Sequence, residues 1–205
     1  MIRDDVPLPT PMSAAPAFAP VRRLFPPHHD ALLASAIRDE VIKARGYWTA
    51  TSEDLGAVRR LGHSPEIVRG GAALMIPLWD VHGAVAFTVA RPDVPRVDSR
   101  GKPRKYETPR AAKLTLDVNP LARPALQAAD TPVWIAEGLK KADAALSAGA
   151  GCAIALVGVW SWKRHAIPAW DAVHLRDRSC YLAFDSDCQS NARWPRRCDG
   201  FGPFS

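Results

Sequence analysis

Three carboxylate side chains stand where two apolar segments end. Glu137 follows the segment Val133–Ala136, and Asp185 and Asp187 follow Cys180–Phe184. Side chains alternate along an extended chain, so Asp185 and Asp187 point the same way. Loops at the carboxyl ends of neighbouring parallel strands converge on one crevice, where we expect the three carboxylates to meet. Crowded carboxylates repel one another unless a hard cation lies among them, which predicts a site for Mg²⁺ or Mn²⁺.

These carboxylates lie in a pattern that resembles a known family. Glu137-Gly138 with Asp185-Ser186-Asp187 resembles the TOPRIM domain of bacterial-type primases, topoisomerases and some nucleases. The flanking residues Trp134–Asp143 and Val157–Trp162 are more narrowly similar to TOPRIM-like domains of phage and plasmid replication proteins, primase-related modules often joined to a helicase. The resemblance covers roughly Ala72 to Asp187. It implies an α/β fold with a Rossmann-like parallel sheet and flanking helices.

The resemblance also implies roles for the carboxylates. Glu137 would be a general base or a metal ligand, and Asp185 and Asp187 would hold Mg²⁺. The reaction would be nucleotidyl transfer from nucleoside triphosphates on a single-stranded DNA or RNA template, in the replication of a mobile element and with a replicative helicase as partner. The same carboxylates suit a TOPRIM nuclease, and a non-catalytic single-strand-binding module or inactive remnant stays open. A generic doubly wound nucleotide-binding domain is disfavoured because Glu137-Gly138 lacks the glycine spacing of a dinucleotide loop.

A basic segment, Arg91–Lys113, precedes the carboxylates. It holds eight basic and three acidic residues, and so most of the net charge of +6. Basic groups neutralise phosphates and aromatic rings stack on bases, which makes this segment a candidate nucleic-acid interface. The candidates are Arg91, Lys102, Arg104, Lys105 and Tyr106. The lobe before TOPRIM in bacterial primases is similar, although a solvated loop would carry the same charges.

Two further groups could contact phosphates or bases. Lys140 and Lys141 fall in the first turn of a helix expected after Gly138, where backbone N–H groups also favour anions. Trp162, Lys163 and Arg164 interleave aromatic and basic side chains, as single-strand sites do. Exposed helix lysines and core tryptophans are the alternative interpretations.

The surrounding pattern predicts the elements that position these groups. Ala73–Asp80 and Ala84–Ala90 predict a β-hairpin, with Pro77 indicating an edge strand or a bulge. Apolar residues at four-residue steps predict a helix within Asp30–Arg45, and Thr51–Asp54 predicts a capping box. These short helices could form a DNA-reading helix-turn-helix, but a helical scaffold is favoured.

The totals place the chain among globular proteins. Of its 205 residues, 47% are hydrophobic and 23% charged. No apolar run approaches the ~18 residues of a membrane helix. The N-terminus has no apolar secretory segment. The four cysteines lack a Cys-x-x-Cys pair, which indicates reduced thiols and a cytoplasmic location, with a zinc site that uses His165 or His174 as the alternative.

Four regions are expected along the chain. Residues 1–27 would be a flexible Pro/Ala-rich leader, 28–130 a basic lobe of helices and a β-hairpin, 131–187 a partial TOPRIM-like domain, and 188–205 an irregular tail. Only 18 residues follow Asp187, without helical or strand periodicity. We interpret this as a C-terminal truncation, so any primase-like nucleotidyltransferase activity of the chain stays an open expectation.

Overall fold

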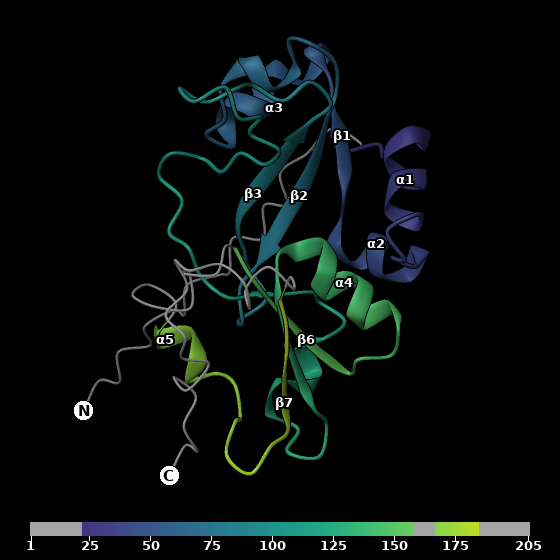
Figure 1. Ribbon diagram of the computed structural model, residues 1–205, viewed down its shortest axis with the longest axis vertical. Coiled ribbons are helices and arrows are strands. Elements are labelled where there is room, and N and C mark those ends of the chain that lie inside the picture. Colours follow the sequence, from purple (N-terminus) through teal and green to yellow (C-terminus); the bar gives the residue numbers. More distant parts are fainter. Residues whose placement is uncertain (1–21, 158–166, 185–205) are drawn as a thin grey trace, which may run out of the picture.

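The computed structural model describes residues 22–157 and 167–184 (Figure 1). Two sheets follow one another along the long axis of the molecule, and α4 lies at their junction (Figure 1). The helices are α1 (Pro26–Leu33), α2 (Asp39–Arg45), α3 (Leu55–Arg60), α4 (Leu139–Ser147) and α5 (Ile167–Trp170), with 3₁₀ helices η1 (Ser52–Asp54), η2 (Pro65–Val68) and η3 (Arg123–Gln127). The strands are β1 (Trp48–Ala50), β2 (Ala73–Trp79), β3 (Val85–Pro92), β4 (Asp117–Val118), β5 (Val133–Glu137), β6 (Cys152–Leu156) and β7 (Cys180–Ala183). No helix in these described ranges has the length and apolarity needed to cross a membrane.

The first sheet is antiparallel, in the order β1-β2-β3. The predicted β-hairpin is confirmed, because β2 pairs with β3 along its whole length. Successive side chains of β2 point to opposite faces of the sheet and belong to two different hydrophobic cores. Leu74 and Ile76 pack with α1, α2 and Leu139 of α4, whereas Met75 packs with Trp48 and the helices α3 and η2. One face of this sheet therefore already touches α4.

Pro77 lies in β2, the middle strand of the sheet, but beyond the point where β1 ends, and the bulge expected as an alternative agrees with the irregular ladder between Leu78 and Trp79. β1 pairs with β2 only as far as Met75. Beyond that point, the Pro77 carbonyl and the Trp79 N–H bond to the Arg45 and Asp117 side chains at 3.1 and 3.0 Å. The missing proline N–H therefore costs no ladder bond.

Two helices replace the single helix expected within Asp30–Arg45. α1 begins at Pro26, and the chain reverses after Leu33 with Ala36 in the left-handed region at φ 59°. Apolar spacing alone could not show this break, because Ile37 keeps the four-residue step. The capping box at Thr51 and Asp54 is confirmed and opens η1, which leads into α3.

The second sheet has the order β4-β6-β5-β7. β5 is parallel to both β6 and β7, which confirms the expected mostly parallel sheet, and only β4 is antiparallel. Large side chains such as Ile135 and Ile154 fill one face, toward η3 and α5. Ala136, Ala153 and Ala155 lie on the other face, where Ala142 of α4 packs against them. Small side chains on both partners let α4 lie close against the sheet.

The segment Leu114–Asp130 contains β4 and η3, which were not predicted, and contributes Leu116, Val118 and Leu126 to the core. A two-residue strand is too short to show periodicity.

Arg178 anchors the loops at the amino ends of the parallel strands. Its buried guanidinium donates to four backbone carbonyls, those of Ala125, Leu126, Thr131 and His174, at 2.5–3.0 Å. Arg178→Met should lower the free energy of unfolding by roughly 3 kcal/mol, because several carbonyls lose charged donors. Denaturant unfolding would measure this, with the exposed Arg176→Met as the matched control, expected to stay within about 0.5 kcal/mol. Equal effects of the two substitutions would contradict the assignment.

Candidate functional site

Glu137 ends β5 at the junction of the two sheets. Gly138, which follows it, has φ 99°, a value that L side chains rarely adopt. The glycine lets the chain turn directly from β5 into α4, so the half-buried Glu137 carboxylate and the first turn of α4 face one space. In the pair Glu137-Gly138, the glutamate supplies a carboxylate and the glycine allows the turn from β5 into α4.

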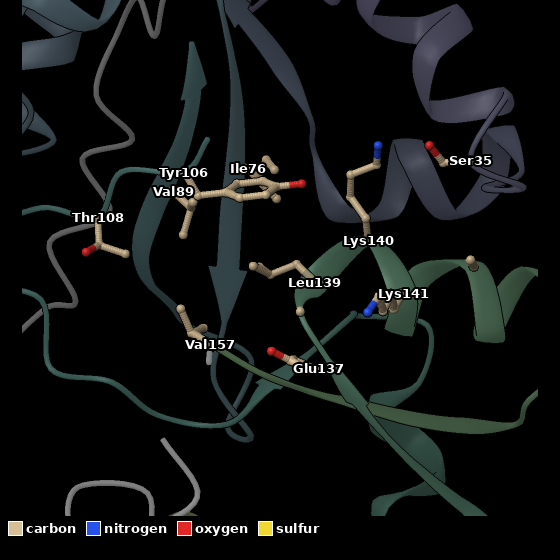
Figure 2. Close-up of a pocket in the computed structure, with 12 residues that line it drawn as sticks. Ser35, Ile76, Val89, Tyr106, Thr108, Glu137, Leu139, Lys140, Lys141 and Val157 are labelled. Atoms are coloured by element: carbon tan, nitrogen blue, oxygen red, sulfur yellow. The ribbon is translucent and has the colours of Figure 1, made fainter. Parts of the chain in front are cut away.

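That space is a cavity of about 540 Å³. Its lining comes from both sheets and from α1–α2 and α4: Ser35, Ile76, Val89, Tyr106, Thr108, Glu137, Gly138, Leu139, Lys140, Lys141, Ala144 and Val157. Figure 2 shows Tyr106 reaching across from the hairpin side and Lys140 rising from α4, with Leu139 and Glu137 between them and the second sheet. An aromatic ring, two ammonium groups and a carboxylate therefore share one hollow.

Tyr106 reaches the cavity because its segment runs beside β3. Ala90 and Glu107 exchange backbone hydrogen bonds of 2.9 and 2.8 Å. The two carboxylate oxygens of Glu107 accept hydrogen bonds from Nε and Nη2 of Arg96. These bonds hold together the two ends of the loop formed by residues 96–107. Thr108 follows on the same segment and also lines the cavity.

Between these anchors the chain forms a second, smaller hairpin, residues 96–105, called here the basic arm. Asp98 accepts N–H bonds from Arg100 and Lys102 at 2.9 Å, and these bonds lower the pKa of its carboxyl group. Lys102, Arg104 and Lys105 are exposed on this arm and do not line the cavity. The predicted phosphate-binding residues therefore divide into a cavity group and an exposed group.

The cavity favours anions. Burial, reinforced by the positive charge of Arg91, lowers the pKa of Lys140. Arg91 lies on β3 two residues after Val89, hence on the same face of the strand as that cavity residue. Lys140 and Lys141 line the cavity with a single carboxylate, Glu137, and Arg91 is near enough to Lys140 to affect its pKa, so a phosphate-bearing ligand would be attracted to this hollow.

The lowered pKa of Lys140 predicts a pH effect. Its ammonium loses its proton at a lower pH than an ordinary lysine, so affinity for inorganic triphosphate should begin to fall earlier in the alkaline range. Lys140→Arg stays charged there and should keep its affinity. Calorimetric titrations at several alkaline pH values would test this, with the exposed Lys113→Arg as control. Parallel pH curves for wild type and Lys140→Arg would contradict it.

Five predicted site residues lie outside the described ranges: Trp162, Lys163, Arg164, Asp185 and Asp187. The strand leading to the aspartates is described. β7 is parallel to β5 with Ala183 beside Ala136, so both strands end at the same edge of the sheet. Within residues 22–157 and 167–184, no group of three His, Cys, Asp or Glu side chains could hold a metal ion. Of the three carboxylates expected at this site, Glu137 is the one that lies within the described ranges.

A buried polar cluster between α2, β4 and α4 was not predicted. Arg45, Asp117 and Asp143 are fully buried and form two ion pairs, Arg45–Asp143 at 2.5 Å and Arg45–Asp117 at 2.8 Å. Tyr47 and Asn119 also donate to Asp143, at 2.6 and 2.9 Å. Asp143 lies on the same helix as Lys140, so α4 carries residues of both the cluster and the cavity.

A sequence profile for a domain of unknown function, DUF3854, matches residues 124–197. That span includes Glu137, Lys140 and Lys141 as well as Asp185 and Asp187. No curated protein sequence matches the chain significantly.

Solved primase domains share this fold. The zinc-binding and RNA polymerase domains of Aquifex aeolicus primase superpose with a TM-score of 0.54 at 14% identity, over 78% of this chain and 43% of theirs. The RNA polymerase domain of Mycobacterium tuberculosis primase DnaG gives 0.53 at 17% identity, over 80% and 61%. The same domain in complex with a double-stranded DNA oligomer with a 6-nucleotide overhang gives 0.53 at 18%, over 82% and 59%. The chain thus has the mixed α/β fold of these domains and spans 43–61% of those chains.

Proposed function

We propose that this chain carries a TOPRIM-like, primase-related core that adds nucleotides on a single-stranded template in the replication of a mobile element. The observation that carries the proposal is Glu137 at the carboxyl end of β5, inside a positively charged cavity that joins the parallel sheet to a basic lobe. The fold shared with primase RNA polymerase domains supports it. The template could be DNA or RNA, and a replicative helicase is the proposed partner in the replicating element.

The donor set suits Mg²⁺ or Mn²⁺, since carboxylate oxygens are the ligands that these hard cations prefer. Glu137 would act as general base or metal ligand, and Asp185 and Asp187 would complete the ligand set. A metal bound there would polarise phosphate oxygens of the nucleoside triphosphate. The aspartates belong to the chain that follows β7, next to β5 in the sheet.

The remaining side chains would bind and orient the nucleic acid and nucleotide. Lys140, Lys141 and Arg91 would hold phosphates in the cavity, and Tyr106 would stack on a base. On the basic arm, Lys102, Arg104 and Lys105 would contact the template backbone, as would Lys163 and Arg164, with Trp162 stacking. The Mycobacterium tuberculosis domain bound to an overhanging DNA oligomer is consistent with such a partner.

A second candidate function is a single-strand-binding module without catalysis. The exposure of the basic arm favours it, because those cations can reach a nucleic acid without the cavity. Such binding would be sensitive to salt and indifferent to divalent metal.

The test is incubation with a 5′-labelled primed template, nucleoside triphosphates and Mg²⁺ or Mn²⁺, with products resolved on a denaturing gel. Metal-dependent lengthening is the expected result, and EDTA should abolish it. Metal-dependent shortening would identify a TOPRIM nuclease and overturn nucleotidyl transfer. Salt-sensitive binding with unchanged length would favour the binding module.

A further inference from the structure

We propose that the buried cluster around Arg45 is a positioning device, which fixes the rotation of α4 about its axis and thereby directs Lys140 into the cavity. The inference concerns the geometry of α4. Its relevance to catalysis rests on the proposed function of the cavity.

The guanidinium of Arg45 joins three elements at once. Its Nε and Nη2 donate to the two oxygens of Asp143 on α4, at 2.5 and 2.7 Å. Its Nη1 donates to Asp117 on β4 at 2.8 Å and to the Pro77 carbonyl on β2 at 3.1 Å. A two-point contact between a planar guanidinium and a carboxylate fixes direction as well as distance.

Further bonds hold the same face of α4. Asp143 also accepts from Tyr47 and Asn119, so its carboxylate receives four hydrogen bonds. One turn later, the hydroxyl of Ser147 accepts from the Arg38 N–H at 3.0 Å. These partners come from α2 and the residues on either side of it, Arg38 and Tyr47, and from Asn119 just after β4, which leaves one rotation that satisfies them all.

A neighbouring face of α4 meets the sheet through alanines, such as Ala142 against Ala153 and Ala155. Leu139 and Leu146 of α4 pack in the core beneath the first sheet. These apolar contacts hold α4 in place without directional bonds, because dispersion and hydrophobic burial are non-directional. The hydrogen bonds of the polar cluster add a preferred direction to this packing.

Stability is a poor explanation for this cluster. One arginine faces two carboxylates in a fully buried site, and the second oxygen of Asp117 has no hydrogen-bond partner among the described residues. Burial raises the pKa of Asp117, which shows the cost of keeping it charged. Apolar residues of similar volume often stabilise a core as well as a buried ion cluster does, whereas ionic groups can select one geometry.

Lys140 would report a change of rotation. It lies three residues before Asp143, about 60° away around the helix. The lowered pKa of its ammonium depends on burial and on Arg91, and both would change if α4 rolled. The ammonium pKa is thus a readout that needs no enzyme activity.

The key variant is Arg45→Met/Asp143→Leu, which replaces the ion pair by apolar side chains. Reductive methylation with ¹³C-formaldehyde followed by NMR would give the Lys140 pKa, with the signal assigned by Lys140→Arg. We expect the Lys140 pKa in the folded double variant to move up toward that of an ordinary lysine. Affinity for inorganic triphosphate should weaken roughly tenfold or more, since small displacements of a binding group are costly.

Arg178→Met is the matched control, because it removes another buried, multiply bonded guanidinium at the amino ends of the strands, away from the cavity. It should destabilise the protein and leave the Lys140 pKa unchanged. Arg45→Lys provides a second test should the double variant not fold. It keeps the positive charge but loses the two-point contact, so the Lys140 pKa should again rise.

An unchanged Lys140 pKa in the folded double variant, or in Arg45→Lys where the double variant does not fold, would overturn the positioning role. So would a wild-type Lys140 that titrates as an ordinary lysine. If the Lys140 pKa rises in the double variant while the wild-type protein synthesises no primer, the positioning role is upheld and only the proposed function is contradicted.

Discussion

Glu137→Gln is expected to lower template-directed nucleotide transfer by about two to four orders of magnitude, the range for loss of a general base. The substitution keeps the shape of the side chain and removes its charge at the cavity. Because Glu137 is only half-buried, the unfolding midpoint should change little. Primer extension with saturating template, alongside thermal unfolding, would measure both quantities.

Glu53→Gln is the matched control, an exposed glutamate in η1 on the far side of the first sheet from α4. It should retain wild-type activity. Transfer by Glu137→Gln at the wild-type rate would remove Glu137 from the proposed chemistry, whatever the fold.

The second large effect is on stability. Arg45→Met should lower the free energy of unfolding by about 3–5 kcal/mol, because it leaves Asp117 and Asp143 as buried carboxylates without their cation. Attraction to these carboxylates raises the pKa of Arg45 in spite of burial, so wild type keeps the cation. Urea unfolding of the variant at neutral pH would measure the loss.

The pH dependence of Arg45→Met gives an independent check. Burial raises the pKa of Asp117, and loss of Arg45 removes the attraction that opposes this rise, so the folded variant binds a proton at Asp117 more readily than the unfolded chain does. The variant should therefore gain stability as the pH falls through that raised pKa. Arg45→Met/Asp143→Leu should recover part of the loss, because it removes one of the two carboxylates left without a cation and retains Asp117. A cost below about 1 kcal/mol for Arg45→Met would contradict the assigned ion pairs.

The sequence predicted the parts of the fold that depend on local pattern. Two apolar runs on either side of a turn that contains Gly83 were sufficient for the β2–β3 hairpin, and continuous apolar runs were sufficient for β5 and β6. The expectation that the strands leading to Glu137 and to Asp185 are neighbours at one sheet edge agrees with the parallel pairing of β5 and β7. Glu137 and Lys140 lie where the pattern predicted, at the end of β5 and the start of α4.

Long-range polar contacts could not be predicted in this way. Arg45 and Asp143 are 98 residues apart in sequence, and each occupies a position in its helix that a solvated charge could equally occupy. The backbone that receives Arg45 at Pro77 is exposed for bonding only because β1 ends early, which no local pattern reports. The path that carries Tyr106 to the cavity depends likewise on the pairing of Ala90 with Glu107.

The most direct test of the central claim is calorimetric titration with Mn²⁺ or Mg²⁺ of wild type and of Asp185→Asn/Asp187→Asn. Asp171→Asn, at an exposed position, is the matched control. A metal site made by Glu137, Asp185 and Asp187 predicts binding to wild type and to Asp171→Asn, and loss of binding in a double variant that stays folded by circular dichroism. Binding of equal strength in the double variant, or none in folded wild type, would contradict the metal-dependent site.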